Sequence, residues 1–205
     1  MLAYAPRSAK SVVMFLLLIA TCAASCKRDG GKSAALSPGS STAVKAQLNV
    51  LRDSVEVKWR DVSAADQQLL GTTGLLLREL KGQPGINPTQ LQGLEQANRR
   101  LKLRRYTQQT MANSALIDQY DAAQDSLLRA LYPVAAPNGD APSANIRGFV
   151  EGIQQTESGV VGIRVSYDRA ARQYNDYLKL HQTELQNVGG KYAALKPLAL
   201  FTIQL

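Results

Sequence analysis

A seam of heptad-like spacing between Phe149 and His181 constrains this chain more than any other feature of its sequence. Side chains suited to a helix interface recur there at alternating steps of four and three, for about five heptads. Such spacing places them along one side of a long helix that packs against other helices. The seam favours packing for Tyr167, Tyr174 and Tyr177 over the alternative, in which a ligand stacks on their rings. Its members are Phe149, Ile153, Thr156, Val160, Ile163, Tyr167, Ala170, Tyr174, Tyr177 and His181.

Two more helical segments precede the seam. An apolar stripe from Leu48 to Leu80 predicts a long helix, which the sequence KGQPG at 81–85 ends. Asn87 then caps a second helix, which we expect to run from Pro88 to Leu131. Its apolar stripe is weak between 104 and 109, where the residues are polar. A loop with three prolines separates it from the seam helix.

No stretch of the sequence alternates with period two for long enough to predict a strand. The predicted fold class is all-α: an elongated antiparallel three-helix bundle with long helices, preceded by a signal or anchor segment and a flexible tether. The predicted organisation is a signal peptide at 1–25, a tether at 26–42, the bundle at 43–188 and an apolar, basic tail at 189–205.

Six glycines lie inside the predicted helices, where each costs roughly 1 kcal/mol of helix propensity relative to alanine. We expect some of them to permit close approach between helices. They are Gly71, Gly74, Gly148, Gly152, Gly159 and Gly162.

The N-terminal segment has the pattern of a bacterial export signal. Arg7 and Lys10 precede an uncharged run, Ser11–Cys26, which is shorter than the ~20 residues needed to span a bilayer. The residues AASC that end at Cys26 resemble the lipobox of bacterial lipoproteins, whose cysteine is lipidated and becomes the first mature residue. We expect lipidation at Cys26, with Cys22 as the less favoured site and an uncleaved signal anchor as the alternative.

Lipidation at this point predicts attachment to the extracytoplasmic (periplasmic) side of a membrane of the bacterial cell envelope, with inner and outer membrane both left open. Residues 30–41 follow, of which eight of twelve are glycine, serine or proline. That composition is typical of a flexible tether.

Positive charge is concentrated in one run of the predicted second helix. The chain has a net charge of +8 at pH 7, and an exported basic protein more readily meets anionic lipid or cell-wall polymer than nucleic acid. No aromatic residue interleaves with the run, so stacking on single-stranded nucleic acid is not expected. The run is either an anion-binding patch or, as the favoured reading, a solvated helix segment whose charges face acidic residues of neighbouring helices. Its members are Arg99, Arg100, Lys102, Arg104 and Arg105.

Residues with obvious catalytic or metal-binding roles are scarce. The single histidine, His181, excludes multi-histidine zinc sites, and no nucleotide-binding fingerprint is present. Asp118, Asp121 and Asp125 share helical spacing and predict either a weak site for a hard cation or, the favoured reading, a solvated acidic face. We therefore predict a protein that is not an enzyme, with no cofactor and no metal site.

The closing helix resembles that of the LemA family of bacterial envelope proteins. The family pattern comprises a phenylalanine, a Thr-Glu-Asn step, an arginine and two Tyr-Asn pairs about seven residues apart. Ser158 and Asp168 stand where that pattern has asparagine, and the tail from Lys191 lacks the usual family ending. The matching residues are Phe149, Thr156, Glu157, Arg164, Tyr167, Tyr174 and Asn175 in this helix, Tyr132-Pro133 before the loop, and Trp59 in the first helix.

The resemblance implies a membrane-attached, elongated helical bundle on the outer face of the membrane, in a family whose biochemical activity is not established. We therefore expect a lipid-anchored scaffold or adaptor with a protein partner in the envelope. The alternative is a binder of anionic lipid or cell-wall polymer. The apolar tail is expected to dock on the bundle, with contact to a membrane or partner as the other possibility; the oligomeric state is not predicted.

Overall fold

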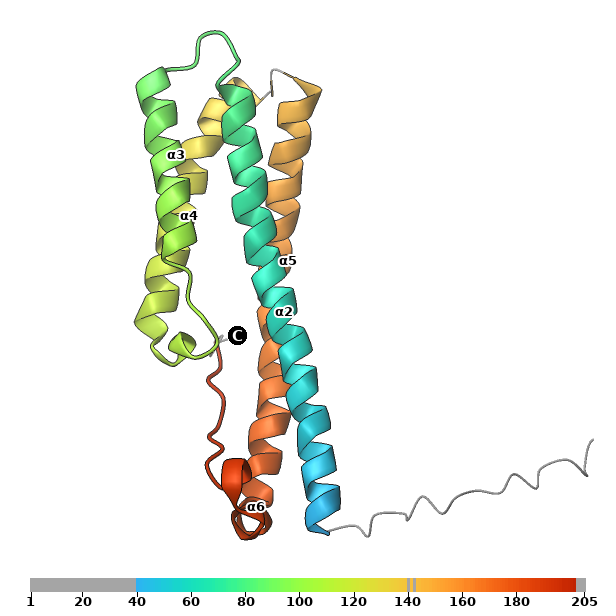
Figure 1. Cartoon of the computed structure of the whole chain (residues 1–205). Helices are drawn as coiled ribbons and strands as arrows, with labels where there is room; N and C mark the ends of the chain where they lie inside the picture. The colour runs from blue at the N-terminus through green and yellow to red at the C-terminus, as the bar shows by residue number, and fades with distance from the viewer. Residues whose placement is uncertain (1–39, 140, 142, 202–205) are drawn as a thin grey trace, which may run out of the picture. The chain divides into compact units, whose positions relative to one another are not determined.

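The computed structural model describes residues 40–139, 141 and 143–201 (Figure 1). The predicted signal peptide, the candidate lipidation sites Cys26 and Cys22, and most of the tether lie outside these residues. Every regular element in the described ranges is helical, which confirms the all-α prediction. None of these helices combines the length and the apolar character that a membrane span requires. The α-helices are α2 (Ser41–Leu80), α3 (Pro88–Leu103), α4 (Ser114–Ala135), α5 (Ala144–Leu180) and α6 (Gln182–Val188), and the 3₁₀ turns are η1 (Thr110–Ala112), η2 (Pro137–Gly139) and η3 (Gly190–Tyr192).

The two longest helices, α2 and α5, run antiparallel and pack side by side (Figure 1). At ~1.5 Å per residue each is over 50 Å long. α2 begins at Ser41, inside the range 26–42 predicted as tether, and the Oγ of Ser40 caps it by accepting from the Ala43 N–H at 3.2 Å. The Oγ of Ser143 caps α5 in the same way, accepting from the Ile146 N–H at 3.2 Å. Both starts follow the usual preference for serine at this position.

The predicted second helix, from Pro88 to Leu131, is wrong in one respect. The structure divides it into α3 and α4, which are joined by residues 104–113. In this connection the Thr107 N–H donates to Thr110 Oγ1 at 2.8 Å, and the Thr110 N–H donates back to Thr107 Oγ1 at 3.2 Å. Hydroxyl contacts of this kind compete with the backbone hydrogen bonds of a helix. In the described residues α2, α3, α4 and α5 thus pack together where three long helices were expected.

Two side chains of the connection turn into the interior and help to hold the break. Met111 is buried, and Tyr106 packs against both hydrophobic cores. In a continuous helix these two side chains would lie in a polar stretch that has no apolar face to bury them. Full burial of Met111 stabilises the turn by roughly 1.5–3 kcal/mol, and the partly buried ring of Tyr106 adds to this.

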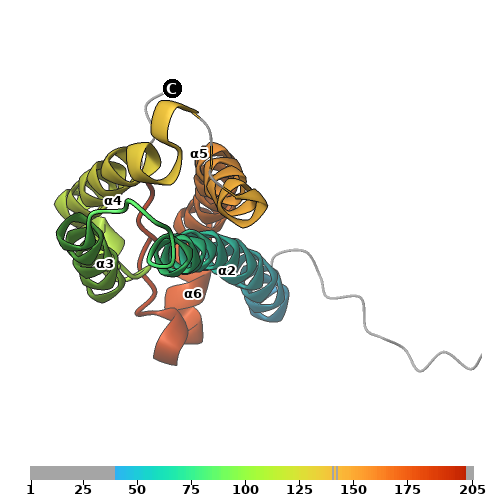
Figure 2. The same cartoon turned by 90° about the horizontal axis from the view of Figure 1, so that it is seen from above.

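Because α3 and α4 double back, they cover only part of the α2–α5 pair (Figure 1). The first core lies where all four helices meet, and the second lies toward the start of α2 and the end of α5. Residues 195–201 of the tail, called the strap below, are not helical and complete the second core. Seen from above, the α3–α4 pair and the α2–α5 pair lie on different sides of the molecule (Figure 2), and Figure 1 shows the strap running from α6 toward the lower end of the α3–α4 pair. The second core includes Val44, Leu48, Val55, Met111, Tyr167, Tyr174 and Leu178.

The prediction that some of the six glycines permit close approach between helices is confirmed at two positions. A Cβ on Gly74 would lie 3.3 Å from Asn98 Nδ2 of α3, and one on Gly152 would lie 3.8 Å from Thr72 Cγ2 of α2. These two glycines allow close contact between helices. The other four have no neighbour within 4 Å of a Cβ, and they are Gly71, Gly148, Gly159 and Gly162.

Candidate functional site

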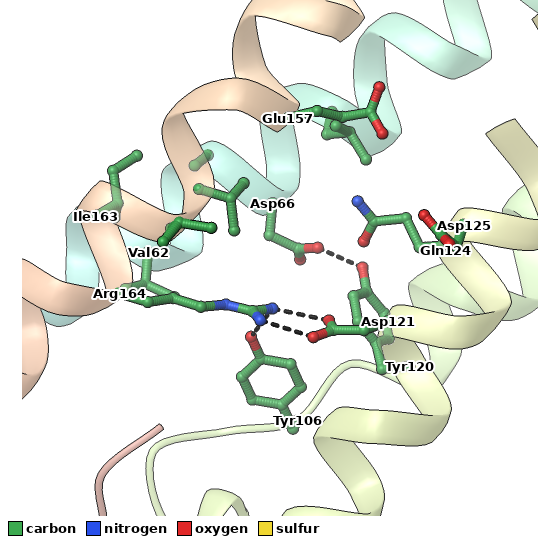
Figure 3. Close-up of a pocket in the computed structure, with 14 residues that line it drawn as sticks. Val62, Asp66, Tyr106, Tyr120, Asp121, Gln124, Asp125, Glu157, Ile163 and Arg164 are labelled. Carbon is green, nitrogen blue, oxygen red and sulfur yellow. Dashed lines mark hydrogen bonds and ion pairs between the residues drawn. The ribbon is translucent and has the colours of Figure 1, made fainter. Parts of the chain in front are cut away.

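The most developed polar site is a pocket of about 180 Å³ between α2, α4 and α5 (Figure 3). Aliphatic side chains line part of its wall, and four carboxylates and an arginine line the rest. The helices carry these groups at positions one or two turns apart, so they face the same space. The charged residues of the pocket are Asp66, Asp121, Asp125, Glu157 and Arg164.

Arg164 of α5 and Asp121 of α4 form a bidentate ion pair across the pocket (Figure 3). Its two N–O distances are 2.6 and 2.7 Å. Arg164 Nη2 also donates to the hydroxyl of Tyr106 at 3.1 Å, and its guanidinium lies 5.0 Å from the ring centre of Phe201. Burial opposes the charge of Arg164, but the hydrogen bonds to Asp121 and Tyr106 outweigh it and raise its pKa. The guanidinium is therefore a permanent cation that joins α5, α4, the connection and the strap.

Asp66 of α2 forms the second link. Its carboxylate pairs with Arg105 and accepts a hydrogen bond from the hydroxyl of Tyr120. Burial raises the pKa of Tyr120, and the hydrogen bond to Asp66 raises it further. The phenol thus stays protonated and acts as a donor. Arg105 also donates to the carbonyl of Ser63 at 3.3 Å, so this member of the predicted basic patch is committed to the interior.

The two remaining carboxylates of the pocket are also engaged. Glu157 accepts a hydrogen bond from the hydroxyl of Tyr132. Burial and this hydrogen bond raise the pKa of Tyr132. Asp125 pairs with Arg129 at 2.6 Å. Every carboxylate that lines the pocket therefore has a partner, and the arrangement braces three helices.

The acidic triplet of α4 does not converge on one point. Asp121 faces Arg164, Asp125 faces Arg129, and Asp118 is exposed. Among the described residues no group of three or more histidine, cysteine, aspartate or glutamate side chains is placed to hold a metal ion. The favoured reading of a solvated acidic face fits Asp118 and Asp125, which are both exposed, whereas Asp121 pairs with Arg164 of another helix.

The predicted basic patch lies at the C-terminal end of α3. Arg99 is exposed and lies 3.7 Å from Glu95. Arg100, Lys102 and Arg104 are exposed and form no salt bridge with any described residue, and Leu103 between them is 86% exposed. Residues 100, 102, 103 and 104 are called the basic tip below. Positive side chains are favoured here, because the carbonyl end of a helix carries partial negative charge.

The strap is held by side chains of α5. Asn175 Oδ1 accepts from the N–H of Leu198 at 2.7 Å, and Asn175 Nδ2 donates to its carbonyl at 2.9 Å. Asp168 Oδ1 accepts from the N–H of Phe201 at 2.9 Å, and the Tyr167 hydroxyl donates to the carbonyl of Ala199 at 3.2 Å. For the described residues, the docking of the tail on the bundle is confirmed.

An aromatic cluster receives the end of the strap. The ring of Phe201 stacks on Trp59 at a centroid distance of 6.4 Å and meets Tyr106 and Tyr167 edge-on at 6.0 and 5.6 Å. Sequence reasoning missed this site. The available signal was the repeat of a tyrosine followed by aspartate or asparagine, at 167–168 and 174–175.

The other residues of the LemA-like pattern have structural surroundings. Tyr174 is buried in the second core, and Phe149 packs on the first. Thr156 Oγ1 donates to the carbonyl of Gly152 at 2.8 Å, within α5. His181 follows the last residue of α5, and its Nδ1 lies 3.2 Å from Glu184 Oε1.

A comparison with protein-family models, with curated proteins and with solved structures finds no match to this chain.

Proposed function

We propose that this protein is a lipid-anchored, LemA-like scaffold or adaptor of the bacterial cell envelope, with a binding role rather than a catalytic one. The observation that carries the proposal is the pocket network. The ion pair of Arg164 with Asp121 joins α5 to α4, and the hydrogen bond from Tyr120 to Asp66 joins α4 to α2. Such pairs hold helices at fixed positions, and a rigid bundle is what a scaffold requires.

A catalytic acid or base would need different surroundings. A general base must reach a substrate proton and have a pKa near the working pH. Tyr106 and Tyr120 have pKa values raised by burial, so they remain neutral phenols. Asp66 and Asp121 are bound to arginines, which favours a bracing role for both carboxylates.

Lipidation at Cys26 and the tether that follows it complete the proposal. A flexible segment of this composition lets a folded body reach partners away from the membrane surface. We propose the elongated bundle as the body and an exposed helix face as the contact surface. The basic tip is the first choice for that surface, because its charges and Leu103 are exposed together.

Site-specific photocrosslinking in cells tests the adaptor. A photoreactive residue is placed at Arg100 of the full-length protein, and a matched control carries it at Gln155, an exposed position on α5. One dominant protein adduct that forms from Arg100 and not from Gln155 is the expected result. Adducts with lipid or polymer alone would contradict the adaptor and favour the second candidate.

The second candidate is a binder of anionic lipid or cell-wall polymer through the basic tip. Leu103, at 86% exposed between charged neighbours, is the observation that favours it. A surface of this kind adds apolar contact to electrostatic attraction for an anionic membrane. Arg105 is excluded from this surface, because it pairs with Asp66.

A vesicle-tethering measurement separates the two candidates. The full-length protein is anchored in neutral vesicles, and light scattering follows their clustering with phosphatidylglycerol vesicles at low and high salt. The triple variant Arg100→Gln, Lys102→Gln, Arg104→Gln should lose salt-sensitive clustering if the tip binds anions. The control Arg147→Gln, Arg169→Gln, Arg172→Gln removes equal charge elsewhere on the surface, and equal losses in both variants would contradict a specific patch.

A further inference from the structure

We propose that the face of α5 that holds the strap is a recognition site for an extended peptide of another envelope protein, and that the strap is its intramolecular occupant. This inference rests on the proposed adaptor function and names a partner class for it. The site consists of Tyr167, Asp168 and Asn175 of α5, with Trp59 and Tyr106 completing an aromatic receptor.

The spacing of two α5 side chains matches the spacing of an extended chain. Asp168 and Asn175 are seven residues apart, which corresponds to about 10.5 Å along a helix. They bind Phe201 and Leu198, and three residues of extended chain span about 10 Å. Side chains seven residues apart on the helix can therefore bind residues three apart on an extended segment that runs antiparallel to the helix.

The hydrogen bonds between α5 and the strap involve backbone groups of the strap rather than its side chains. α5 binds the N–H and carbonyl of Leu198, the carbonyl of Ala199 and the N–H of Phe201. These groups belong to any extended segment that lacks proline at the positions of Leu198 and Phe201. The ring of Phe201 is the one strap side chain that enters a cluster of aromatic rings.

The strap is less buried than the site that holds it. No residue of 195–201 is fully buried, whereas Tyr167 is 0% and Asp168 5% exposed. Among the described residues the hydrogen bond of Asp168 comes from Phe201 of the strap. A buried carboxylate without a donor is costly, so the site favours exchange of one peptide for another over standing empty. The strap leaves the helices at Gly189 and Gly190, whose φ angles are 72° and 58°.

Charge decides between a second copy and a different protein as the outside occupant. The chain carries a net charge of +8, which includes Lys191 and Lys196 of its own tail, so the charges of two copies repel each other. Arg104 of the basic tip lies two residues before Tyr106, which contacts Phe201. A segment with an aromatic residue three positions after an apolar one, and with acidic flanks, therefore suits the site better than the strap of another copy.

Peptide binding to the full-length protein tests the proposal. The probe is a fluorescent peptide with the sequence of residues 193–201, AALKPLALF, and the readouts are its anisotropy and the emission of Trp59, the single tryptophan. The variant Phe201→Ala weakens the intramolecular strap, which otherwise competes at an effective concentration in the millimolar range. We expect saturable binding to Phe201→Ala that is at least about tenfold tighter than binding to the unaltered protein.

Two controls identify the backbone contacts. The same peptide with N-methylleucine at the position of Leu198 lacks the N–H that Asn175 binds, and it should bind roughly tenfold more weakly. Asn175→Ala in the Phe201→Ala background should give a similar loss. Replacing Lys196 of the peptide with glutamate should strengthen binding at low salt, because the protein carries a net positive charge.

Several results would overturn the proposal. The first is no saturable binding to Phe201→Ala while its circular dichroism stays helical, and Phe201→Leu serves as the second variant if the first unfolds. Equal binding of the N-methylated peptide would mean nonspecific apolar adhesion. A dimer of the unaltered protein in light scattering, lost in Phe201→Ala, would assign the site to a second copy instead. Crosslinking from Arg100 is independent of all these outcomes, so the adaptor and the peptide site can fail separately.

Discussion

Asn175 on α5 binds Leu198 through both polar atoms of its side-chain amide, at 2.7 and 2.9 Å. One side chain thereby satisfies the N–H and the carbonyl of a residue that belongs to no helix or strand. The contact sets the register of the strap, and Asp168 repeats the principle with Phe201. A helix face has become a template for an extended chain.

The first prediction concerns Asn175. In Asn175→Asp the acceptor for the Leu198 N–H remains, but an oxygen replaces the donor and faces the Leu198 carbonyl. We expect the free energy of unfolding to fall by about 1–3 kcal/mol and the Leu198 amide to exchange faster. Urea unfolding and hydrogen exchange measure the two effects. Asn187→Asp, an equal charge change at an exposed position on α6, is the control and should be nearly neutral. A similar loss in both variants would mean that charge alone is responsible.

The second prediction concerns the pair of Arg164 and Asp121, whose side chains are 17% and 39% exposed. Arg164→Lys keeps the charge but loses the bidentate geometry and the bond to Tyr106. We expect a loss of about 1–3 kcal/mol in the free energy of unfolding, less than for a fully buried pair. The exposed pair of Arg129 with Asp125 provides the comparison, because Arg129→Lys should cost below about 0.5 kcal/mol. Equal costs would show that the pocket network does not brace the bundle.

The third prediction concerns alkaline pH. Burial raises the pKa of Tyr106, Tyr120 and Tyr132 above the unfolded value of about 10. Above that pH the unfolded chain releases phenol protons that the folded chain keeps, so the free energy of unfolding falls as pH rises. The contribution is complete below pH ~10 and is lost as pH rises through the higher folded-state pKa.

Urea unfolding at about pH 9 and about pH 11 measures this loss. Tyr120→Phe should make the decline shallower by up to about 1.4 kcal/mol per pH unit, since one phenol no longer titrates. Tyr192→Phe removes a phenol outside the pocket and is the control. An unchanged slope in Tyr120→Phe would show that its phenol titrates alike in both states.

The fourth prediction compares two glycines inside helices. Gly159→Ala meets no atom within 4 Å and should stabilise the protein by about 0.5–1 kcal/mol, because alanine favours the helix. Gly74→Ala brings a Cβ within 3.3 Å of Asn98 Nδ2, which is buried and bonded to the Leu70 carbonyl at 3.3 Å. Its free energy of unfolding should be lower than that of Gly159→Ala by about 1 kcal/mol. Thermal unfolding tests the order, and a more stable Gly74→Ala would contradict tight packing of α3 on α2.

Local pattern was sufficient for much of the fold. The stripe that ends at Leu80 and the seam that includes Tyr167 and Tyr174 lie on the buried faces of α2 and α5. Asn87 caps α3 as predicted, because its Oδ1 accepts from the N–H groups of Thr89 and Gln90 at 3.0 and 3.2 Å. These features depend on contacts within a few residues, so a single sequence contains them.

Distant contacts determined the rest. The polar stretch after Leu103 is weak evidence for a break, and the turn becomes stable only when Tyr106 and Met111 find a core to enter. The sequence assigns Arg105 to a basic patch, whereas the structure pairs it with Asp66 of α2. Sequence spacing cannot identify the core that receives Tyr106 and Met111 or the carboxylate that pairs with Arg105, because both lie far more than one helical turn away along the chain.

The amino-acid sequence by itself determined the helical class, the positions of α2 and α5, and the apolar character of a tail that packs against the bundle. Only the tertiary structure decided that the second predicted helix folds back into α3 and α4. It also decided that the strap packs against the part of the α2–α5 pair that α3 and α4 do not cover. The strap then places Phe201 among the rings of Trp59, Tyr106 and Tyr167. The physical reason is that helix periodicity is a local property of the chain. The register of an extended segment depends instead on hydrogen-bond partners, such as Asp168 and Asn175, that only folding brings within reach.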